Sequence, residues 1–379
     1  MSKIRDLNAY EAAPTAIRDI YKFYQKLPRD QLESDPGIID FRRGLDPEQQ
    51  RVVHLVGTIP RLSLNAAYGQ LGVGKSAQVS TPVPDVSVYE VDSLPGELSC
   101  QNYVNKSDDL GLRLIPSLLC GQAQERLLSI LLHDNLANQR HKTNVHLHHR
   151  IPYYATLLKT CGASERKEDG FVPSFFRISP DSTEKLFTPL DEVVHNPFTV
   201  SQFLSRKLRW LTLGGQFDWT GKRYPLEDEP PFPTDIGNFI SSLFPYMKPQ
   251  AAIVNIYRPG DVLSVHRDVS EESDNALVSF SLGCEAILVA GLHYMEGEKP
   301  RSVAIRLCSG DAICLSGQAR FAWHGVPQVL QGTSPDWLRN WPADANTDVL
   351  SADSPQRYEA WRGWMLNKRV NLSVRQIRD

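Results

Sequence analysis

The last third of the chain carries a closely spaced series of short, β-branched segments, and this series limits the possible folds more than any other feature. Turn-forming pairs such as Pro259-Gly260 and Gly310-Asp311 separate the segments. Segments of this length and spacing are typical of an antiparallel sandwich or barrel. Helical patterns at residues 15–28 and 115–136 precede the series, so the sequence predicts an α+β protein. The segments are AAIVNIY, ALVSFSLG, AILVAG, SVAIRL and DAICLSG within residues 250–330, and RVNLSVRQ at 369–376.

Composition excludes several classes of protein. The 379 residues are 41% hydrophobic and 22% charged, which is ordinary for a chain with a sizeable core. A formal net charge of −3 gives no overall attraction to nucleic acid, so such binding would need a local basic surface. The six cysteines include no Cys-x-x-Cys pair, which argues against structural zinc and is typical of an intracellular protein. The sequence shows neither a long apolar run nor an apolar signal core, so we expect no membrane span and no secretion.

Two short motifs imitate phosphoryl-transfer sites. Residues 69–76 read GQLGVGKS and match the P-loop pattern, but prolines follow too closely for the helix that a P-loop requires. The His-Arg-Asp triplet at 266–268 matches the start of a kinase catalytic loop, yet the residue five positions after Asp268 is Ser273 instead of asparagine. We therefore expect an exposed loop at 69–76 and no kinase activity.

The same His-x-Asp motif also begins non-haem iron sites. Residues i and i+2 of a strand point to the same face, so His266 and Asp268 can present an imidazole and a carboxylate to one ion. A second histidine would complete the two-His, one-carboxylate set of Fe(II) oxygenases. His324 in FAWHGVPQV is the candidate, because it lies among apolar strand residues. The alternative for an isolated His-x-Asp motif is a hydrogen-bonded surface pair.

The final predicted strand, residues 369–376, has two contrasting faces. Arg369, Asn371, Ser373 and Arg375 share one face, and apolar side chains occupy the other. In a barrel the polar face lines the interior, where guanidinium groups are costly without anionic partners. A dicarboxylate ligand would supply such a partner, because arginine binds carboxylate through a planar fork. The alternative is a polar face that is simply solvated.

Four motifs, taken in chain order, resemble those of the AlkB family of Fe(II)/2-oxoglutarate dioxygenases. They are N-x-Y at 255–257, H-x-D at 266–268, the histidine at 324 and R-x-N-x-S-x-R at 369–375. LRWLTLGGQFDWTGKRYP (208–225) and PFPTDIGNFI (231–240) are similar to the AlkB homologue 1 branch. The resemblance implies a double-stranded β-helix (jelly-roll) core with supporting helices and a nucleotide-recognition lid. It also implies Fe(II) on His266, Asp268 and His324, and 2-oxoglutarate held by Asn255, Tyr257, Arg369, Asn371, Ser373 and Arg375.

The lid and its neighbourhood carry further candidates. Basic segments at 205–210 and 221–223 flank Trp219 and Tyr224, which we expect to contact the substrate base, with an ordinary charged surface as the alternative. Trp210 is predicted to be a core residue. RHKTNVHLHHR (140–150) holds four histidines, and we interpret it as a solvated basic segment and not as a metal site. Two places depart from the family's pattern: Ser373 stands where relatives often have threonine, and the hairpin Gly-Gly-Leu-x-Arg reads AGLHY at 290–294, without the arginine.

The sequence thus predicts an N-terminal extension, residues 1–105, with one helix and a loop-rich segment, followed by a dioxygenase domain at 106–379. Within it we place the lid at about 205–245, the β core at 250–330 and 369–379, and an insert at 331–368 that includes a helix. We expect a monomeric enzyme of the nucleus, cytoplasm or mitochondrion that uses dioxygen to demethylate N-methylated bases. Its substrate would be tRNA, or single-stranded or flipped-base DNA. Two alternatives stay open: an oxygenase acting on a protein or small molecule, and a non-catalytic nucleic-acid-binding protein.

Overall fold

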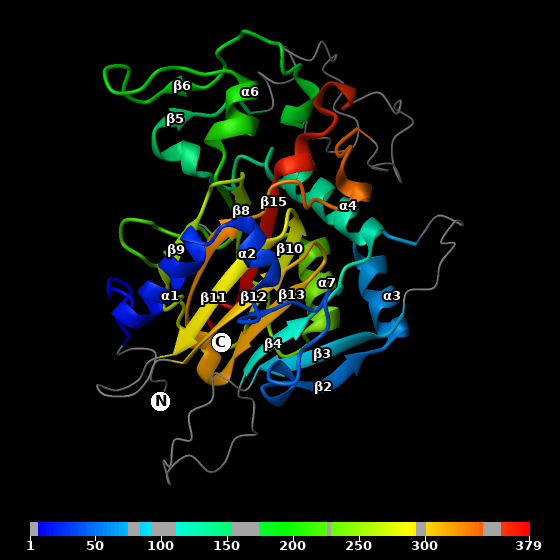
Figure 1. Cartoon of the computed structure of the whole chain (residues 1–379). Helices are drawn as coiled ribbons and strands as arrows, with labels where there is room; N and C mark the ends of the chain where they lie inside the picture. Colours follow the sequence, from blue (N-terminus) through cyan, green and yellow to red (C-terminus); the bar gives the residue numbers. More distant parts are fainter. Residues whose placement is uncertain are drawn as a thin grey trace.

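Two β-sheets face each other at the centre of the molecule (Figure 1). The computed structural model describes residues 7–74, 84–91, 111–153, 174–225, 229–292, 301–343 and 358–379. The larger sheet contains, in spatial order, β2 (Val53–Ile59), β3 (Val86–Val91), β4 (Gly111–Ile115), β13 (Ala312–Ser316), β10 (Leu277–Gly283), β15 (Arg369–Arg375), β8 (Ala251–Tyr257) and β7 (Trp210–Gly214). The smaller sheet contains β1 (Ile38–Ile39), β12 (Arg301–Leu307), β11 (Ala286–Leu292), β14 (Trp323–Val329) and β9 (Leu263–His266).

The order of the strands is that of a jelly roll. From β8 to β15 the chain passes back and forth between the two sheets, with only β11 and β12 consecutive in one sheet. All pairings among these core strands are antiparallel. The predicted α+β fold with a double-stranded β-helix core is therefore confirmed.

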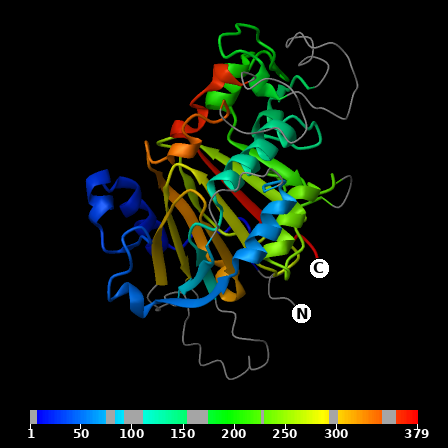
Figure 2. The ribbon, with the colours of Figure 1, turned by 90° about the vertical axis from the view of Figure 1, so that its right-hand side faces the viewer.

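Helices cover the outer faces of both sheets, as Figure 2 shows. The larger sheet is covered by α3 (Arg61–Gln70), α4 (Gly121–Ser129) and α7 (Thr234–Leu243), and the smaller by α1 (Thr15–Lys26) and α2 (Arg29–Ser34). Both predicted helices are confirmed: α1 buries Ile17, Tyr21 and Tyr24, and α4 continues into a π-helical turn at Ile130–Asn135. In the described part of the chain, no helix is long and apolar enough to cross a membrane. Further short elements include α6 (Val200–Gln202), β5 (His149–Arg150) and β6 (Thr188–Pro189).

The alternation in β15 decides what lies between the sheets. Val370, Leu372 and Val374 join the core under the covering helices. Since alternate residues of a strand point to opposite faces, Arg369 and Arg375 point between the two sheets, and both are buried. The predicted inward orientation of the polar face is thus confirmed.

The structure differs from the sequence-based expectation in the N-terminal region and in the insert. Where a loop-rich segment was expected after α1, the chain forms α2, α3 and three strands, and β2 and β3 extend the larger sheet through β4. The segment at 69–76 begins as the end of α3, so no strand precedes it as a P-loop requires. Within the described residues of 331–368, only short 3-10 helices occur: Asp336–Leu338, Glu359–Trp361 and Trp364–Asn367.

A buried ion network fastens the N-terminal region to the smaller sheet. The side chain of Arg306, on β12, is 0% exposed. Its Nε lies 3.1 Å from Asp40 Oδ2, and its Nη1 lies 3.0 Å from carboxylate oxygens of both Glu33 and Glu285. Arg42 contacts Asp40 and Glu285 from the other side, at 2.7 Å each. Breaking one partner of such a network leaves an uncompensated buried charge, so the contact is energetically important.

Candidate active site

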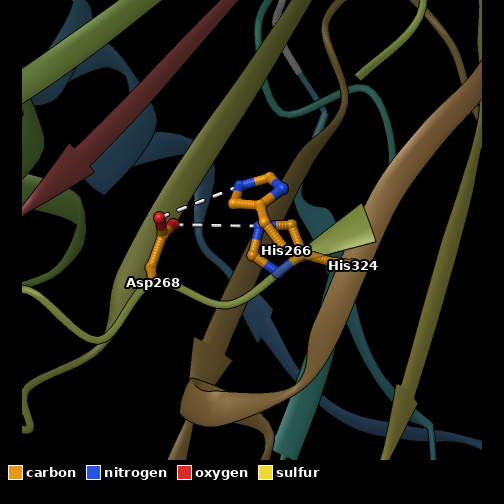
Figure 3. A group of neighbouring side chains, drawn as sticks. All are labelled: His266, Asp268 and His324. Carbon is orange, nitrogen blue, oxygen red and sulfur yellow. Dashed lines mark ion pairs between the residues drawn. The ribbon is translucent and has the colours of Figure 1, made fainter. Parts of the chain in front are cut away.

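His266, Asp268 and His324 meet beside β9, the edge strand of the smaller sheet, and its neighbour β14 (Figure 3). His266 ends β9 and His324 is the second residue of β14, and the two residues lie directly opposite each other in the ladder. Asp268 follows β9 by two residues, and its carboxylate oxygens lie 3.8 Å from His266 Nε2 and 3.8 Å from His324 Nε2. The potential ligand atoms all lie within 4.8 Å of one another. Three donors on one side of a shared point are the arrangement that the facial triad of Fe(II) oxygenases requires.

Backbone contacts fix which nitrogen of each imidazole faces the carboxylate. Nδ1 of His266 lies 2.9 Å from the Ser264 carbonyl, and Nδ1 of His324 lies 3.0 Å from the Ala322 carbonyl. A carbonyl can only accept, so each Nδ1 carries the proton and each Nε2 presents a lone pair. Such carbonyl partners are the usual support of metal-binding histidines.

The ionisation states also suit a metal ion. Burial lowers the pKa of His324 to about 4, with a further contribution from His266, so its imidazole is neutral at neutral pH. Burial alone would raise the pKa of the Asp268 carboxyl, but Arg375 and the two histidines outweigh burial and hold it well below its ordinary value. A neutral imidazole at His324 and an ionised carboxylate at Asp268 fit Fe(II).

Arg369 is the second notable group between the sheets. It is 1% exposed, and its Nη2 donates to Ser281 Oγ at 2.9 Å, whereas its Nε has no hydrogen-bond partner. Within the described part of the chain, no carboxylate lies within ion-pair distance of its guanidinium. Burial lowers the pKa of Arg369, opposed by Tyr257. A buried guanidinium without a counter-ion is costly, so the site suits an anionic ligand.

The other expected cosubstrate residues line the same interior. Asn255 and Tyr257 of β8 pair in register with Asn371 and Arg369 of β15. The side-chain Nδ2 of Asn371 donates hydrogen bonds to Ser279 Oγ at 2.9 Å and to Ser373 Oγ at 3.2 Å. The structure therefore brings together all six residues that the sequence analysis assigned to 2-oxoglutarate.

Two buried residues that the sequence analysis missed support the metal ligands. Arg320, 1% exposed, donates through Nη1 to the Asp268 carbonyl at 2.7 Å and through Nη2 to Glu271 Oε2 at 3.1 Å. Glu271 Oε1 in turn lies 3.5 Å from Arg375 Nη1, and Arg375 Nη2 lies 3.6 Å from Asp268 Oδ2. Arg320 belongs to a 3-10 turn, Gly317–Phe321, that carries no recognisable motif, so only the folded chain shows its role.

Comparison with known proteins agrees with this geometry. The model of the 2OG-Fe(II) oxygenase superfamily matches residues 179–375, more than half of the chain. The chain belongs to this superfamily. It is 39% identical to the N6-methyladenosine RNA demethylase ALKB1 of Pyricularia oryzae over 99% of both chains. It is 45% identical to the N6-methyladenosine RNA demethylase ALKBH of Cryphonectria parasitica, over 62% of this chain and 100% of that one. It is 34% identical to the tRNA demethylase abh1 of Schizosaccharomyces pombe, over 77% of this chain and 82% of that one.

These relatives confirm the AlkB family and the homologue 1 branch that the motifs indicated. As a member of this superfamily, the AlkB-type oxygenase uses Fe(II) and 2-oxoglutarate as cofactors, and the His266, Asp268 and His324 group is the described cluster that suits the metal. The family hairpin at 290–294 lies partly outside the described residues, so its departure stays a statement about the sequence.

The predicted lid residues Trp219 and Tyr224 occupy different environments in this oxygenase. Tyr224 is 7% exposed, and its hydroxyl accepts a hydrogen bond from Arg375 Nη1 at 3.2 Å. Trp219 is 40% exposed and lies at the tip of a hairpin closed by Asp218 and Arg223. Phe217 connects the two rings, at 4.9 Å from Trp219 and 5.2 Å from Tyr224. The contacts thus run from the surface to the metal ligands.

Two further expectations need correction. Trp210, predicted as core, is only half-buried, and its ring lies 4.8 Å from that of Trp219. The segment 140–150 is not uniformly solvated: His141 is 2% exposed and its Nδ1 contacts the Asn135 carbonyl at 3.3 Å. His146 accepts from the Thr143 backbone N–H at 2.8 Å, and so caps a short 3-10 helix. Among the described residues, none of these histidines belongs to a metal-binding cluster.

Proposed function

We propose that the chain is a dioxygenase that removes methyl groups from N-methylated bases in RNA, with N6-methyladenosine as the first base to test. One observation carries the proposal: a His266, Asp268 and His324 group whose Nε2 atoms face the carboxylate, in the same interior as the uncompensated Arg369. When bound, Fe(II) with 2-oxoglutarate and dioxygen oxidises the methyl group, which leaves as formaldehyde while succinate and carbon dioxide are released. The substrate class is supported by relatives named as RNA and tRNA demethylases.

Different residues of the chain would bind the metal and the cosubstrate. His266, Asp268 and His324 would hold the metal, and the carbonyls of Ser264 and Ala322 would keep both imidazoles in the binding tautomer. Arg369 would bind the far carboxylate of 2-oxoglutarate through its fork. Side chains assigned to the remainder of the cosubstrate are Asn255, Tyr257, Asn371, Ser373 and Arg375.

Arg375 would also stabilise the metal-binding carboxylate, because its guanidinium lies beside Asp268. Its guanidinium favours the ionised form of the Asp268 carboxyl, as does each histidine. Glu271 and Tyr224 orient the guanidinium from the other side, at 3.5 Å and 3.2 Å. The chain therefore keeps the metal's carboxylate ionised and in place.

The exposed Trp219 supports a base as substrate. A base must leave a duplex or come from a single strand to reach a buried metal, and an exposed aromatic ring can stack on it or on its neighbour. The hairpin around Trp219 is held by the N-terminal segment, because Tyr10 Oη donates to the Thr220 carbonyl at 3.1 Å and Lys222 Nζ donates to the Ala9 carbonyl at 2.8 Å.

The test is turnover with Fe(II), 2-oxoglutarate and dioxygen on paired RNA oligonucleotides with and without one N6-methyladenosine. We expect formaldehyde from the methylated RNA only, an equal amount of succinate above the uncoupled background, and neither product from the Asp268→Ala variant. Succinate stimulated by a protein or a small molecule, and not by methylated RNA, would replace the proposal by the first alternative. RNA binding without 2-oxoglutarate turnover would favour the second. Light scattering tests the expected monomer, and fractionation tests the expected compartments.

A further inference from the structure

Two basic segments that are distant in the sequence meet at the outer edge of the larger sheet. β7 is the last strand there, and residues 142–144 run beside it. The Thr212 backbone N–H donates to the Lys142 carbonyl at 2.8 Å. Asn144 donates through Nδ2 to the Lys207 carbonyl and accepts at Oδ1 from the Arg209 N–H, both at 2.8 Å. These bonds join the two segments into one surface, the basic edge, formed by Arg140, Lys142, Arg206, Lys207 and Arg209.

The basic edge carries positive charge that its surroundings leave largely uncompensated. All five side chains belong to exposed residues. Arg209 forms an ion pair with Asp261. For Lys142, Arg206 and Lys207, the described parts of the chain place no carboxylate within ion-pair distance. A local cationic surface on a chain whose formal net charge is −3 indicates an anionic partner.

The basic edge continues directly into the aromatic residues of the hairpin. Trp210 follows Arg209, and its backbone N–H also donates to Asn144 Oδ1, at 3.3 Å. The Trp210 ring lies 4.8 Å from that of Trp219, from which the contacts described above lead inward to Arg375. In Figure 1 the elements next to the two basic segments, β5 and α6, lie together beyond one end of the sheets. Cations, an exposed ring and the metal ligands thus follow one another along the molecule.

We propose that the basic edge binds the phosphodiester backbone of the single-stranded RNA that flanks the reacting base. The inference rests on the proposed function and adds the path of the strand outside the active site. Single strands are bound by cations that follow the phosphates together with aromatic rings that stack on the bases, and this surface offers both. An acidic protein segment would need the cations but not the neighbouring exposed tryptophan.

Binding of the full-length chain to a labelled single-stranded RNA tests the inference without iron or turnover. Each phosphate contact to a single strand contributes about 0.7 to the slope of log Kd against log salt. Arg206→Ala/Lys207→Ala should therefore lower the slope by about 1.4 and raise Kd about 25-fold at about 0.1 M salt. Lys142→Ala, from the other segment, should lower it by about 0.7 and raise Kd about 5-fold. The matched control is Arg51→Ala/Arg61→Ala, two exposed arginines next to β2 at the opposite edge of the sheet, which should change neither.

A second measurement separates this inference from the proposed function. Demethylation of a methylated trinucleotide, which lacks the flanking strand assigned to the basic edge, should be the same in the double variant and the wild type, whereas KM for the long RNA should rise with Kd. Absence of turnover by the wild type on both the trinucleotide and the long methylated RNA would refute the proposed function and leave the binding test intact. Unchanged Kd and salt slope in the double variant, or an equal loss in the control, would overturn the inference. So would tight binding of polyglutamate with no binding of RNA.

Discussion

Replacing Arg369 by methionine should separate cosubstrate binding from metal binding. The guanidinium is 1% exposed, its Nε has no hydrogen-bond partner, and the described residues offer it no counter-ion. The far carboxylate of 2-oxoglutarate would therefore be its ion-pair partner, and losing such a buried pair costs about 2–5 kcal/mol. This corresponds to a weakening of 2-oxoglutarate binding by about 30-fold to several thousandfold. Lysine at this position should rescue only part of the loss, because a point charge cannot form the fork.

The same variant makes an unusual prediction for stability. Methionine removes a buried charge that has no counter-ion among the described residues and leaves only neutral hydrogen-bond partners such as Ser281, so the ligand-free variant should be at least as stable as the wild type. At 2-oxoglutarate about 100 times above the wild-type Kd, the wild type should gain about 2.7 kcal/mol and the variant less than about 1 kcal/mol. Arg306→Met is the matched control, because that buried guanidinium contacts Asp40 and Glu285. It should destabilise the free protein by about 3–5 kcal/mol and leave 2-oxoglutarate affinity unchanged.

The assay is a 2-oxoglutarate titration of wild type, Arg369→Met and Arg369→Lys, followed by succinate release and by thermal unfolding with and without ligand. Metal content is measured in parallel, since His266, Asp268 and His324 should still bind iron. Unchanged cosubstrate affinity in Arg369→Met at full iron loading would refute the reasoning, because the buried guanidinium would then have another function.

Four shorter predictions test other parts of the site. Asp268→Ala should abolish 2-oxoglutarate decarboxylation with an unchanged circular dichroism spectrum, and full activity at saturating iron would contradict the metal assignment. Trp219→Ala should slow RNA demethylation about 5- to 150-fold, the equivalent of about 1–3 kcal/mol of stacking, and spare uncoupled 2-oxoglutarate consumption; an equal fall in both would assign the ring a structural role. Arg320→Met should weaken Fe(II) binding about 10- to 100-fold by freeing the Asp268 backbone, which a metal titration checks; wild-type affinity would mean that other contacts hold this ligand. Burial lowers the pKa of His141 to about 4, below its unfolded value of about 6.5. The free energy of unfolding should therefore fall as the pH drops from about 6.5 to about 4, by up to about 1.4 kcal/mol per pH unit. In urea unfolding, His141→Gln should lose less stability than the wild type between pH 7 and pH 5.

The parts of the site that follow a short periodic pattern could be predicted from the sequence. Alternation placed Arg369 and Arg375 on one face of the last strand, and apolar neighbours on the other face turned that side inward. His266 and Asp268 do meet at one point, although only His266 belongs to a strand and Asp268 lies two residues beyond the end of β9. These relations depend on backbone geometry over a few neighbouring residues, so they can be read directly from the sequence.

Other parts depend on which segments meet, and local patterns do not contain that information. Arg320 and Glu271 become partners only because the turn before β14 folds over the loop after β9. β2 and β3 escaped prediction because β2 pairs with β3, and β3 joins the larger sheet through β4, which lies beyond a long polar stretch. Tyr224 was assigned to the substrate from the hairpin sequence, but its hydroxyl is hydrogen-bonded to Arg375, so a direct contact with the base stays a prediction.

The ion network around Arg306 has a practical consequence for preparing the protein in parts. The sequence suggests a natural cut near residue 106, after which all residues assigned to the metal and to 2-oxoglutarate are retained. A shortened chain starting there would lose Asp40, leave Arg306 with Glu285 as its remaining partner, and open an unprotected edge on β4. The unpaired backbone groups of an exposed strand edge pair with the same edge of other chains. We therefore expect such a chain to be recovered mainly as aggregate, even though every catalytic group is present.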